Sequence, residues 1–504
     1  MNKIVSNLSQ LRNNQKNKIV LCYGHFNVIH PGHIQYFEYS KNLGNTLVLA
    51  VRTTEHNDRD YGSNYFPLKE RCKGLSSINI IDHIIPLEEL DILQVINSIK
   101  PSYFVLGKEH ENSEDQVLNN AIKTLDSLNG QMVYYKGSFH KSNSEYFFDN
   151  VSNIEKERIK KLILSSRNQK IEISNLIYQI NNFSSSSLLV VGDTIVDQYI
   201  DCNALGMSSE APVIVVKEKE SKGFLGGAAI VAAHAKCLGA KCKYISVAGN
   251  DHVYDFVKKE LSNLKIESFI IRDDERPTTF KTRYLVENQK VFRVSKIDES
   301  SISKDIEDEI ISKVESEIKN VNGILVSDFV YGVITERVLN QIMYLAKKNK
   351  VLLFGDLQCS SQVGDIKKFK NFDLICPTEK EARIALGSKD FSIEWLANKI
   401  IEKTNSKNLI MKLGGDGFVA YETKTDNFVN RQHFPALNVN PLDVTGAGDS
   451  LLAALSVGIS SGSSIMESSI IAAVVASLAV QNMGNIPINK KQLIEYIKDI
   501  ERYE

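Results

Sequence analysis

The sequence predicts an α/β protein of two domains: a small Rossmann-like domain, then a larger doubly wound domain that carries a β flap. The chain has 504 residues, more than one hydrophobic core usually organises. In both halves, strand-like apolar runs alternate with amphipathic helical stretches, as in parallel sheets covered by helices. A charged helical segment and four consecutive serines separate the halves. We therefore expect domains at 1–149 and 184–504, joined by a helical linker at 150–183.

Composition excludes several classes of protein. The formal net charge is -1, which leaves no strong field to attract nucleic acid or an anionic membrane. The seven cysteines contain no C-x-x-C pair, which argues against structural zinc and disulfides and fits a reducing compartment. The longest apolar stretch, Ile470 to Val480, is too short to span a bilayer, and the polar N-terminus does not resemble a signal peptide. We expect a cytoplasmic protein whose partners are small molecules.

The N-terminal half begins the α/β alternation. A helical pattern runs from Gly32 to Leu43 after the first apolar run. Later runs lack the length of helices and are rich in β-branched and aromatic residues, which favours short buried strands. The predicted strands are Ile19–Tyr23, Leu47–Val51, Tyr103–Leu106 and Met132–Tyr135.

A pattern suited to phosphate chemistry follows the first predicted strand. The strand ends at Gly24 and leads through a turn into His30-Pro31-Gly32-His33. Gly32 removes a side chain at the start of a predicted helix, whose free N–H groups and dipole bind anions. Two histidines three residues apart can donate hydrogen bonds to one α-phosphate, and each such donor is worth about 2.7–4 kcal/mol in a transition state. The pattern predicts nucleotidyl transfer with His30 and His33 as catalytic residues.

Residues 17–145 resemble the cytidylyltransferase-like nucleotidyltransferases. The resemblance rests on the histidine motif, on Glu70-Arg71 after a Pro-Leu pair, and on a loop that begins Gly107-Lys108. It implies that Arg71 and Lys108, with Gly24 and Gly32, bind the nucleoside triphosphate and the acceptor phosphate. Asn27 stands where the family usually has Asp. Whether the nucleotide is ATP or CTP stays open.

The second half repeats the alternation and adds β-like segments with no helix between them. Its predicted strands are Leu188–Val191, Ile324–Ser327, Val351–Gly355, Leu374–Pro377 and Leu409–Leu413. Helical stretches separate them, which indicates a doubly wound sheet. The segments Val213–Lys217 and Thr278–Val294 predict a small antiparallel flap.

A second phosphate motif lies near the C-terminus. Residues 443–449 read D-V-T-G-A-G-D and precede a small, apolar helical stretch. Gly446 and Gly448 let backbone N–H groups converge on a phosphate at a helix N-terminus. Asp449 then lies where it can accept the proton of an attacking hydroxyl, a role worth about 10²–10⁴ in rate. Phosphoryl transfer otherwise needs positioning and charge neutralisation, usually with Mg²⁺. The motif predicts a kinase with Asp449 as its base.

From Leu188 onward the chain resembles the ribokinase-like (PfkB) carbohydrate kinases, and most closely the kinase half of the bifunctional heptose enzymes. Lys281 and Arg283 are two apart and share one face of a predicted strand, a suitable pair for a second phosphate on the sugar. The resemblance implies sugar binding by Asp193, Asp197, Gly226, Gly227, Lys281, Arg283 and Asn288, and nucleotide binding by Lys412, Gly414, Gly417, Gly446, Ala447 and Gly448.

The chain departs from the kinase pattern at several positions. Ile230 stands where an Asn is usual, Thr378 replaces the Asn of an N-x-x-E motif, and Gln358 replaces the Lys of Asp-Pro-Lys. Glu381 of the N-x-x-E motif remains, as an indirect Mg²⁺ ligand. The departures spare Asp449, so they indicate a changed substrate. The domain order is the reverse of that in the heptose enzymes, so the sugar cannot be inherited from the resemblance.

Together the two motifs predict a bifunctional enzyme. ATP would phosphorylate a sugar or sugar phosphate, heptose 7-phosphate-like, and a nucleoside monophosphate would then be joined to the sugar 1-phosphate. Two alternatives stay open. The kinase-like half could bind sugar phosphate without turnover and control the transferase, or a polyol-phosphate cytidylyltransferase could be fused to an unrelated kinase. The resemblance to sugar kinases also implies a homodimer formed through the flap.

Overall fold

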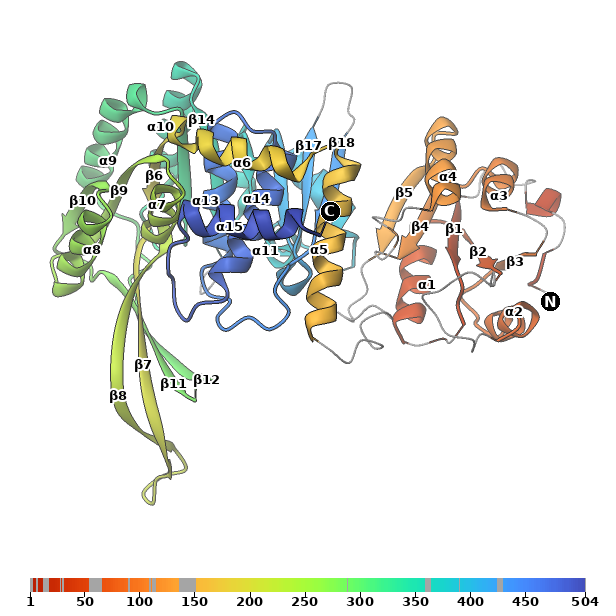
Figure 1. The fold of residues 1–504 in the computed structure, drawn as a ribbon, viewed down its shortest axis with the longest axis horizontal. Coiled ribbons are helices and arrows are strands. Elements are labelled where there is room, and N and C mark those ends of the chain that lie inside the picture. Colours follow the sequence, from red (N-terminus) through yellow and green to blue (C-terminus); the bar gives the residue numbers. More distant parts are fainter. Residues whose placement is uncertain are drawn as a thin grey trace. The chain divides into compact units, whose positions relative to one another are not determined.

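The computed structural model describes residues 3–5, 8–11, 18–27, 29, 31–53, 66–88, 91–107, 110, 115–135, 151–287, 289–358, 364–388, 390–423 and 429–503. The chain divides into two compact units (Figure 1). One comprises Met1–Asn150 and Ser388–Leu396, and the other comprises Val151–Gly387 and Ala397–Glu504. The domain limits expected from the sequence stay a prediction.

The first unit contains a five-stranded parallel sheet in the order β3-β2-β1-β4-β5. Its strands are β1 (Ile19–Gly24), β2 (Thr46–Arg52), β3 (His83–Leu87), β4 (Tyr103–Gly107) and β5 (Gln131–Tyr135). Its helices are α1 (Pro31–Leu43), α2 (Leu68–Ser76), α3 (Ile92–Ile99) and α4 (Gln116–Ser127), with a 3₁₀ turn at Leu8–Leu11. The four strands expected from the sequence are confirmed, and β3 was missed.

Both faces of this sheet are covered. Val20 and Leu21 are neighbours in β1, yet they belong to two different hydrophobic clusters. Successive side chains of a strand point to opposite faces, so each face has its own core, as parallel sheets require. The strand order reverses between β1 and β4, and ligands of open α/β sheets bind beyond the carboxyl ends of the strands at such a switch point. Gly24 and Gly107 end these two strands.

The second unit is built on a nine-stranded sheet in the order β10-β9-β6-β13-β14-β15-β16-β17-β18. Its strands are β6 (Ser187–Gly192), β9 (Lys241–Gly249), β10 (Glu267–Asp273), β13 (Gly323–Asp328), β14 (Leu352–Leu357), β15 (Leu374–Ile375), β16 (Asn408–Lys412), β17 (Phe418–Thr423) and β18 (Val429–Phe434). Pairing is parallel from β10 to β16, and β17 and β18 are antiparallel. The five strands expected here are confirmed, and β9, β10, β17 and β18 were missed.

Helices flank this sheet. They are α5 (Val151–Asn168), α6 (Ile173–Asn181), α7 (Gly227–Cys237), α8 (His252–Asn263), α9 (Lys304–Glu317), α10 (Glu336–Asn349), α11 (Glu379–Leu386), α12 (Ile393–Thr404), α13 (Ala447–Ser460), α14 (Ile465–Ala479) and α15 (Lys490–Glu501). Short 3₁₀ turns lie at Asn182–Ser185, Ile318–Asn320, Ile366–Lys368 and Gly414–Asp416. Among the helices of the described ranges, none is long and apolar enough to cross a membrane.

The helical segment expected as a linker is part of the core of the second unit. Leu162 and Ile163 of α5, and Ile173, Leu176 and Ile180 of α6, are buried in the same hydrophobic cluster as α7, α13 and α14. Burying large aliphatic side chains stabilises by about 1.5–3 kcal/mol each. The segment therefore contributes to the stability of this unit as well as leading into it.

The flap is a separate four-stranded sheet in the order β12-β11-β7-β8. It consists of β7 (Thr194–Met207), β8 (Ile214–Gly226), β11 (Thr279–Val286) and β12 (Gln289–Lys296), which extend away from the helices of the second unit (Figure 1). The expected antiparallel pairing is present in β7–β8 and in β11–β12, whereas β7 and β11 pair in parallel. The 14-residue strand β7 was missed. It follows β6 with only Asp193 between them, so no turn sequence marks its start.

Replacing Leu176 by Ala should lower the free energy of unfolding of the second unit by about 2–5 kcal/mol, because the side chain is fully buried and would leave a cavity. Denaturant unfolding monitored by fluorescence or circular dichroism would measure it. Tyr178→Ala on the same helix is the control, since Tyr178 is 68% exposed. Equal, small effects of both changes would contradict the placement of α6 in this core.

Candidate active site

The carboxyl ends of the central strands of the second unit gather charged side chains near the N-terminus of α13. Asp356 lies in β14, Lys412 ends β16, and Asp449 lies in the first turn of α13. All three are buried or nearly so, with side-chain exposures of 1% for Asp356 and 11% for Lys412. The carboxyl ends of parallel strands meet at one edge, so β14 and β16 bring these residues together from distant parts of the chain.

The N-terminus of α13 is open. Gly446 is the N-cap residue with a φ of 78°, in the left-handed region, and no side chain caps this end in the described part of the structure. A Cβ on Gly446 would lie 2.3 Å from Oδ1 of Asn485, and one on Gly448 would lie 3.5 Å from Nζ of Lys412. Only glycine satisfies the first constraint. The N–H of Ala447 donates to the carbonyl oxygen of Val444 at 3.3 Å. The N–H groups of Gly448 and Asp449 begin the helix beside Lys412, an arrangement that binds anions.

A chain of polar contacts joins these groups. Nζ of Lys412 donates to both carboxylate oxygens of Asp356, at 2.8 and 2.9 Å. Nε2 of Gln358 donates to Oδ1 of Asp449 at 2.7 Å and lies 3.5 Å from Oδ2 of Asp356. Burial lowers the pKa of Lys412, but Asp356 and Glu381 raise it further, so it lies above its ordinary value. Lys412 therefore stays charged inside the site.

Asp449 has the properties of a general base for neutral pH. Burial, and then the charge of Asp356, raise its pKa to about 7, against the opposing effect of Lys412. A base whose pKa lies near the operating pH is deprotonated in much of the protein and still accepts a proton readily. The structure thus places the predicted base at an open helix N-terminus, although the catalytic role itself stays a prediction.

The glycine turn after β16 has the conformation its sequence predicts. Gly414 and Gly417 have φ values of 62° and 86°. A Cβ on Gly417 would lie 2.0 Å from the carbonyl oxygen of Phe434, so this position requires glycine. The turn directly follows Lys412, but no described contact shows it binding a nucleotide.

Asp193 and Asp197 both have protein partners in the structure, and sugar binding by them stays a prediction. The Asp193 carboxylate accepts hydrogen bonds from the N–H groups of Phe329 and Val333, at 2.7 and 3.3 Å, and burial raises its pKa. The Asp197 carboxylate is paired with Arg283 and accepts a hydrogen bond from Asn485 at 3.0 Å. Asp193 therefore shapes the loop after β13, and Arg283 neutralises Asp197, because both carboxylates are almost fully buried.

Gly226 and Gly227 make room for these carboxyl groups at the start of α7. A Cβ on Gly226 would lie 2.7 Å from Oδ2 of Asp197, and one on Gly227 would lie 2.4 Å from the Asp193 carbonyl oxygen. Ile230, three residues further on, is fully buried in the hydrophobic core. It therefore offers no contact to a sugar, as its departure from the family pattern suggests.

Lys281 carries a buried positive charge without a partner among the described residues. Its side chain is on the buried face of β11, and the residue is only 4% exposed. Nζ lies 5.6 Å from the ring centre of Phe329 and 5.1 Å from that of Tyr331. No hydrogen bond or ion pair with a described residue neutralises it. A desolvated ammonium of this kind favours an anionic ligand.

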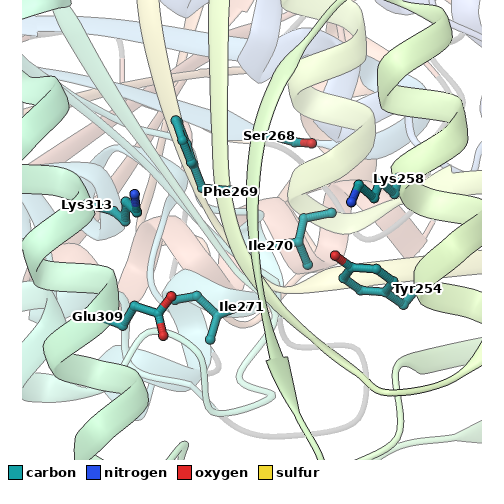
Figure 2. A pocket seen from close by; sticks show the side chains of 8 residues that line it. All are labelled: Tyr254, Lys258, Ser268, Phe269, Ile270, Ile271, Glu309 and Lys313. Carbon is teal, nitrogen blue, oxygen red and sulfur yellow. The ribbon is translucent and has the colours of Figure 1, made fainter.

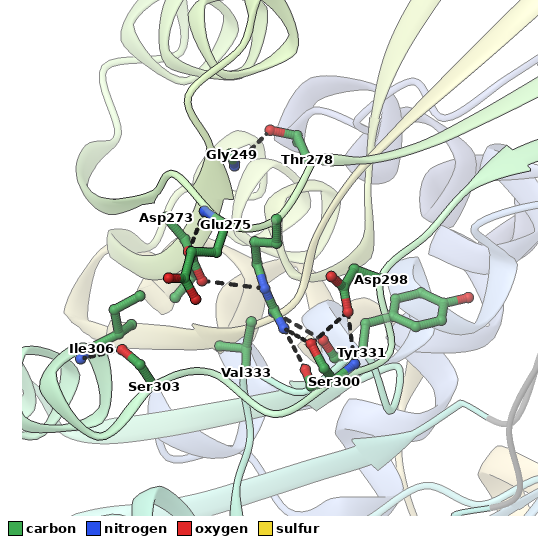
Figure 3. A network of polar contacts seen from close by, with 12 residues as sticks. Gly249, Asp273, Glu275, Thr278, Asp298, Ser300, Ser303, Ile306, Tyr331 and Val333 are labelled. Carbon is green, nitrogen blue, oxygen red and sulfur yellow. Dashed lines mark hydrogen bonds and ion pairs between the residues drawn. The ribbon is translucent and has the colours of Figure 1, made fainter.

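The loop that carries these aromatic residues is fixed by Arg276. Its guanidinium donates to the carbonyl oxygen of Tyr331 at 3.1 Å and to that of Ser300, and it pairs with Asp273 at 3.3 Å. Figure 3 shows this network, with Asp298 holding Ser300. Arg276 thus fixes the loop whose rings lie next to Lys281.

The flap is bonded to the loop that precedes α13. Asp443 accepts hydrogen bonds from Tyr199 of β7 and Lys290 of β12, both at 2.6 Å, and Lys290 also donates to Thr445 at 2.8 Å. Burial opposes ionisation, but these bonds lower the pKa of Asp443 to about 2. Tyr199, Lys290 and Asn485 were missed as site residues, because no local pattern marks a partner that the chain supplies from far away.

No dedicated metal cage is visible in the described ranges. No three His, Cys, Asp or Glu side chains converge as metal ligands there. Oε2 of Glu381 accepts the N–H of Thr378 at 2.7 Å in a capping box at the start of α11. An Mg²⁺ ion that arrives with a nucleotide needs few protein ligands, since it keeps water and phosphate oxygens. The residues present fit an ion that arrives with a nucleotide, and an indirect role for Glu381 stays a prediction.

The predicted site of the first unit is described in part. Gly24 ends β1, Gly32 and His33 lie in the first turn of α1, and the His33 ring is 5.6 Å from that of Phe26. Arg71 donates to the backbone carbonyls of Phe66, His25 and Arg52, so it braces the loops after β1 and β2. His30 and Lys108 lie outside the described residues, as does Asn288 of the second unit. Nucleotide binding by Arg71 stays a prediction.

A separate pocket lies at the free edge of the nine-stranded sheet. It has a volume of about 220 Å³ and is lined by four consecutive residues of β10 and by side chains of α8 and α9 (Figure 2). Tyr254 and Lys258 come from α8, and Glu309 and Lys313 come from α9. None of the predicted site residues lines it.

Two family patterns match the chain. Residues 185–492 match the pfkB family of carbohydrate kinases, and residues 21–123 match the cytidylyltransferase-like family. The two matches fall on the two sheets described above, with the cytidylyltransferase-like match first. The fold is therefore that of a Rossmann-like N-terminal region followed by a ribokinase-like domain, as the sequence predicts.

Similar proteins were found in several bacteria. The chain is 31% identical over 315 residues to the "Bifunctional protein HldE" of Campylobacter curvus, covering 62% of this chain and 65% of that protein. It is 28% identical over 326 residues to the protein of the same name from Desulfatibacillum aliphaticivorans, covering 64% and 65%. The match thus spans less than two thirds of the length of these relatives.

Solved structures support the fold of the larger domain. Phosphofructokinase-2 from Escherichia coli, in complex with substrates and products, has a TM-score of 0.52 at 15% identity and covers 63% of this chain and 100% of its own. Ribokinase from Giardia lamblia has a TM-score of 0.51 at 15% identity and covers 63% and 99%. At such identities the likeness concerns the fold alone.

Replacing Asp449 by Asn should stabilise the protein increasingly as the pH rises. The folded-state pKa of about 7 exceeds the ordinary value of 3.8, so this group favours the folded state below pH 3.8 and loses that contribution as the pH rises to 7. The free energy of unfolding of the variant, relative to that of the wild type, should increase between pH 5 and pH 8 by at most about 3 kcal/mol. Denaturant unfolding at several pH values would measure it. Asp499→Asn, at a side chain 62% exposed, should show no such trend. A gain independent of pH would contradict the raised pKa.

Proposed function

Because the chain belongs to the pfkB family of carbohydrate kinases, we propose that its second unit transfers the terminal phosphoryl group of ATP to a hydroxyl of a sugar phosphate. The observation that carries this proposal is the buried carboxylate of Asp449 at the open N-terminus of α13. The first unit would then transfer a nucleoside monophosphate to the newly formed sugar phosphate. The product would be a nucleotide sugar.

In the proposed phosphoryl transfer, each group at the N-terminus of α13 has one task. Asp449 accepts the proton as the sugar hydroxyl oxygen forms its bond to the terminal phosphorus, and the bond from that phosphorus to the bridging oxygen breaks to release ADP. The amide of Gly448 and the Lys412 ammonium face the charge on the transferring group. An Mg²⁺ ion bound to ATP would supply further charge neutralisation, and Glu381 is the residue that would hold it indirectly.

Lys281 supports an acceptor that already carries a phosphate. The site offers a desolvated ammonium over two aromatic rings, and leaving such a charge without a counter-ion is costly. Arg283, two residues along the same face, is paired with Asp197 and so is the less available cation. The resemblance of the kinase motifs to those of the bifunctional heptose enzymes supports a heptose 7-phosphate-like acceptor.

The nucleotidyl-transfer step is assigned to the first unit. Its support is the cytidylyltransferase-like match over residues 21–123 and the position of Gly24 and His33 beside the β1–β4 switch point. The phosphate of the sugar would attack the α-phosphorus of a nucleoside triphosphate and release pyrophosphate. His33, with His30, would donate hydrogen bonds to the non-bridging oxygens as they gain charge.

The flap supports assembly as a homodimer. Several of its large apolar side chains are more than half exposed to solvent: Leu205, Met207, Val213, Ile214 and Val294. Exposed apolar patches and strand edges favour association. Because β12 and β7 also bond Asp443 beside α13, such a dimer would stabilise the geometry of the kinase site.

Two single substitutions should separate the two activities. Asp449→Asn should abolish sugar-phosphate-dependent ADP formation, because the base is lost, while pyrophosphate release continues when the sugar 1-phosphate is supplied. His33→Ala should do the reverse. Coupled assays for ADP and pyrophosphate, run with ATP and with CTP over a panel of sugar phosphates, would measure both.

Other outcomes of the same assays have distinct meanings. Unchanged ADP formation in Asp449→Asn would refute the base assignment. Calorimetric binding of a sugar phosphate with no ADP formed by the wild type would favour a sensing role for the kinase-like unit. Pyrophosphate release with CTP and a polyol phosphate, unrelated to the product of the kinase, would favour the fused cytidylyltransferase.

Replacing Lys281 by Met should weaken binding of phosphorylated acceptors selectively. A hydrogen bond to a charged group contributes about 1.5–3 kcal/mol, so KM for the sugar phosphate should rise at least about 10-fold. KM for ATP and for the unphosphorylated sugar should change little. Lys296→Met on the exposed part of β12 is the matched control. An equal rise in KM for the phosphorylated and the unphosphorylated acceptor would show that Lys281 does not bind the acceptor phosphate.

A further inference from the structure

Gln358 makes a contact that the proposed chemistry does not yet use. It follows β14, and its backbone N–H donates to the carbonyl oxygen of Asp328 at 2.8 Å, which fixes the main chain. Its Nε2 donates to Oδ1 of Asp449 at 2.7 Å and lies 3.5 Å from Oδ2 of Asp356. Both neighbours are hydrogen-bond acceptors, so the amide nitrogen, rather than the amide oxygen, faces them.

The contact makes the two oxygens of Asp449 unequal. Oδ1 is bound by Gln358, whereas no residue in the described ranges donates to Oδ2. We infer that Gln358 is a positioning residue, which holds Oδ1 so that Oδ2 is the atom that takes the proton of the acceptor hydroxyl. This inference deepens the proposed kinase function and rests on it. It assigns a role to a position where the sequence shows glutamine in place of the usual lysine.

The neutral charge of Gln358 is the second part of the argument. Asp449 is surrounded by Asp356 from β14, Lys412 from β16 and Asp197 from β7. Lys412 already binds Asp356 through both oxygens, and Arg283 is paired with Asp197. A further cation at position 358 would lie within hydrogen-bond distance of the Asp449 carboxylate. An opposite charge that close lowers the pKa of a carboxyl by about 1–3 units.

Glutamine therefore orients the carboxylate without making it a weak base. Its hydrogen bond lowers the pKa of Asp449 only in part, against burial and the charge of Asp356, which raise it to about 7. The cluster of Asp356, Lys412 and Asp449 then carries a formal charge of about -1, which falls to zero when Oδ2 takes the proton. Proton uptake is thus favoured at the moment when the phosphoryl group is transferred.

The test measures the carboxyl group directly. NMR spectra of protein with ¹³C-labelled aspartate carboxyls would follow its titration. The Asp449 signal is identified as the one that is lost in the Asp449→Asn variant. Compared with the wild type, Gln358→Lys should shift its titration midpoint down by about 1–3 units. Gln358→Met, which removes the donor at similar volume, should shift the midpoint up. Gln341→Lys, an equal change of charge on the exposed face of α10, should leave it unchanged.

The pH dependence of kcat/KM for the acceptor should follow the same shifts on its acidic limb. KM for ATP should stay within about 2-fold, whereas a merely structural role would move all parameters together. An unmoved titration midpoint in both Gln358 variants, each folded by circular dichroism, would overturn the inference even if the wild type forms ADP. Shifted midpoints without ADP formation by the wild type on any sugar phosphate would instead overturn the proposed kinase function and, with it, the assignment of Oδ2 as proton acceptor.

Discussion

The burial of a carboxylate beside an open helix N-terminus is the constraint on which the site of the second unit depends. Asp449 is almost fully buried, and desolvation alone would keep it protonated. Burial and Asp356 raise its pKa to about 7, while Lys412 and the Gln358 amide oppose them. Gly446 makes this possible, because its left-handed conformation turns the chain into the helix without a side chain in the way.

The flap supplies the other half of the site and is tied to the first half. The buried face of β11 presents Lys281 and Arg283 toward the ends of the central strands, while Tyr199 and Lys290 bind Asp443 just before α13. Asp443 also accepts the N–H of Thr445 at 2.9 Å. A movement of the flap would therefore disturb the loop that leads into Gly446. The flap and the loop before α13 are thus joined through Tyr199, Lys290 and Asp443.

Local patterns predicted the parts of this structure that local physics determines. The spacing of Gly446, Gly448 and Asp449 predicted a helix start, and α13 begins there without a capping side chain from the described residues. The alternation around Lys281 predicted its shared face with Arg283. The partners were not predictable, because Asp193 bonds a loop 136 residues away and Gln358 bonds a carboxylate 91 residues away. The length of β7 was missed for a related reason, since its pairing with β11 is a long-range contact.

In both units the predicted site lies at the carboxyl ends of parallel strands, but the side chains at the two sites differ. In each sheet, glycine or aspartate ends a central parallel strand at the edge where ligands of open α/β sheets bind. A sugar hydroxyl must lose a proton when it is phosphorylated, so that site needs a buried carboxylate of raised pKa. A sugar phosphate is already ionised when it attacks a nucleotide, so that site needs only donors for the charge that develops, which is what imidazoles such as His33 supply. The proposed sites therefore use different side chains, Asp449 and His33, because only the first of the two proposed steps removes a proton from the attacking group.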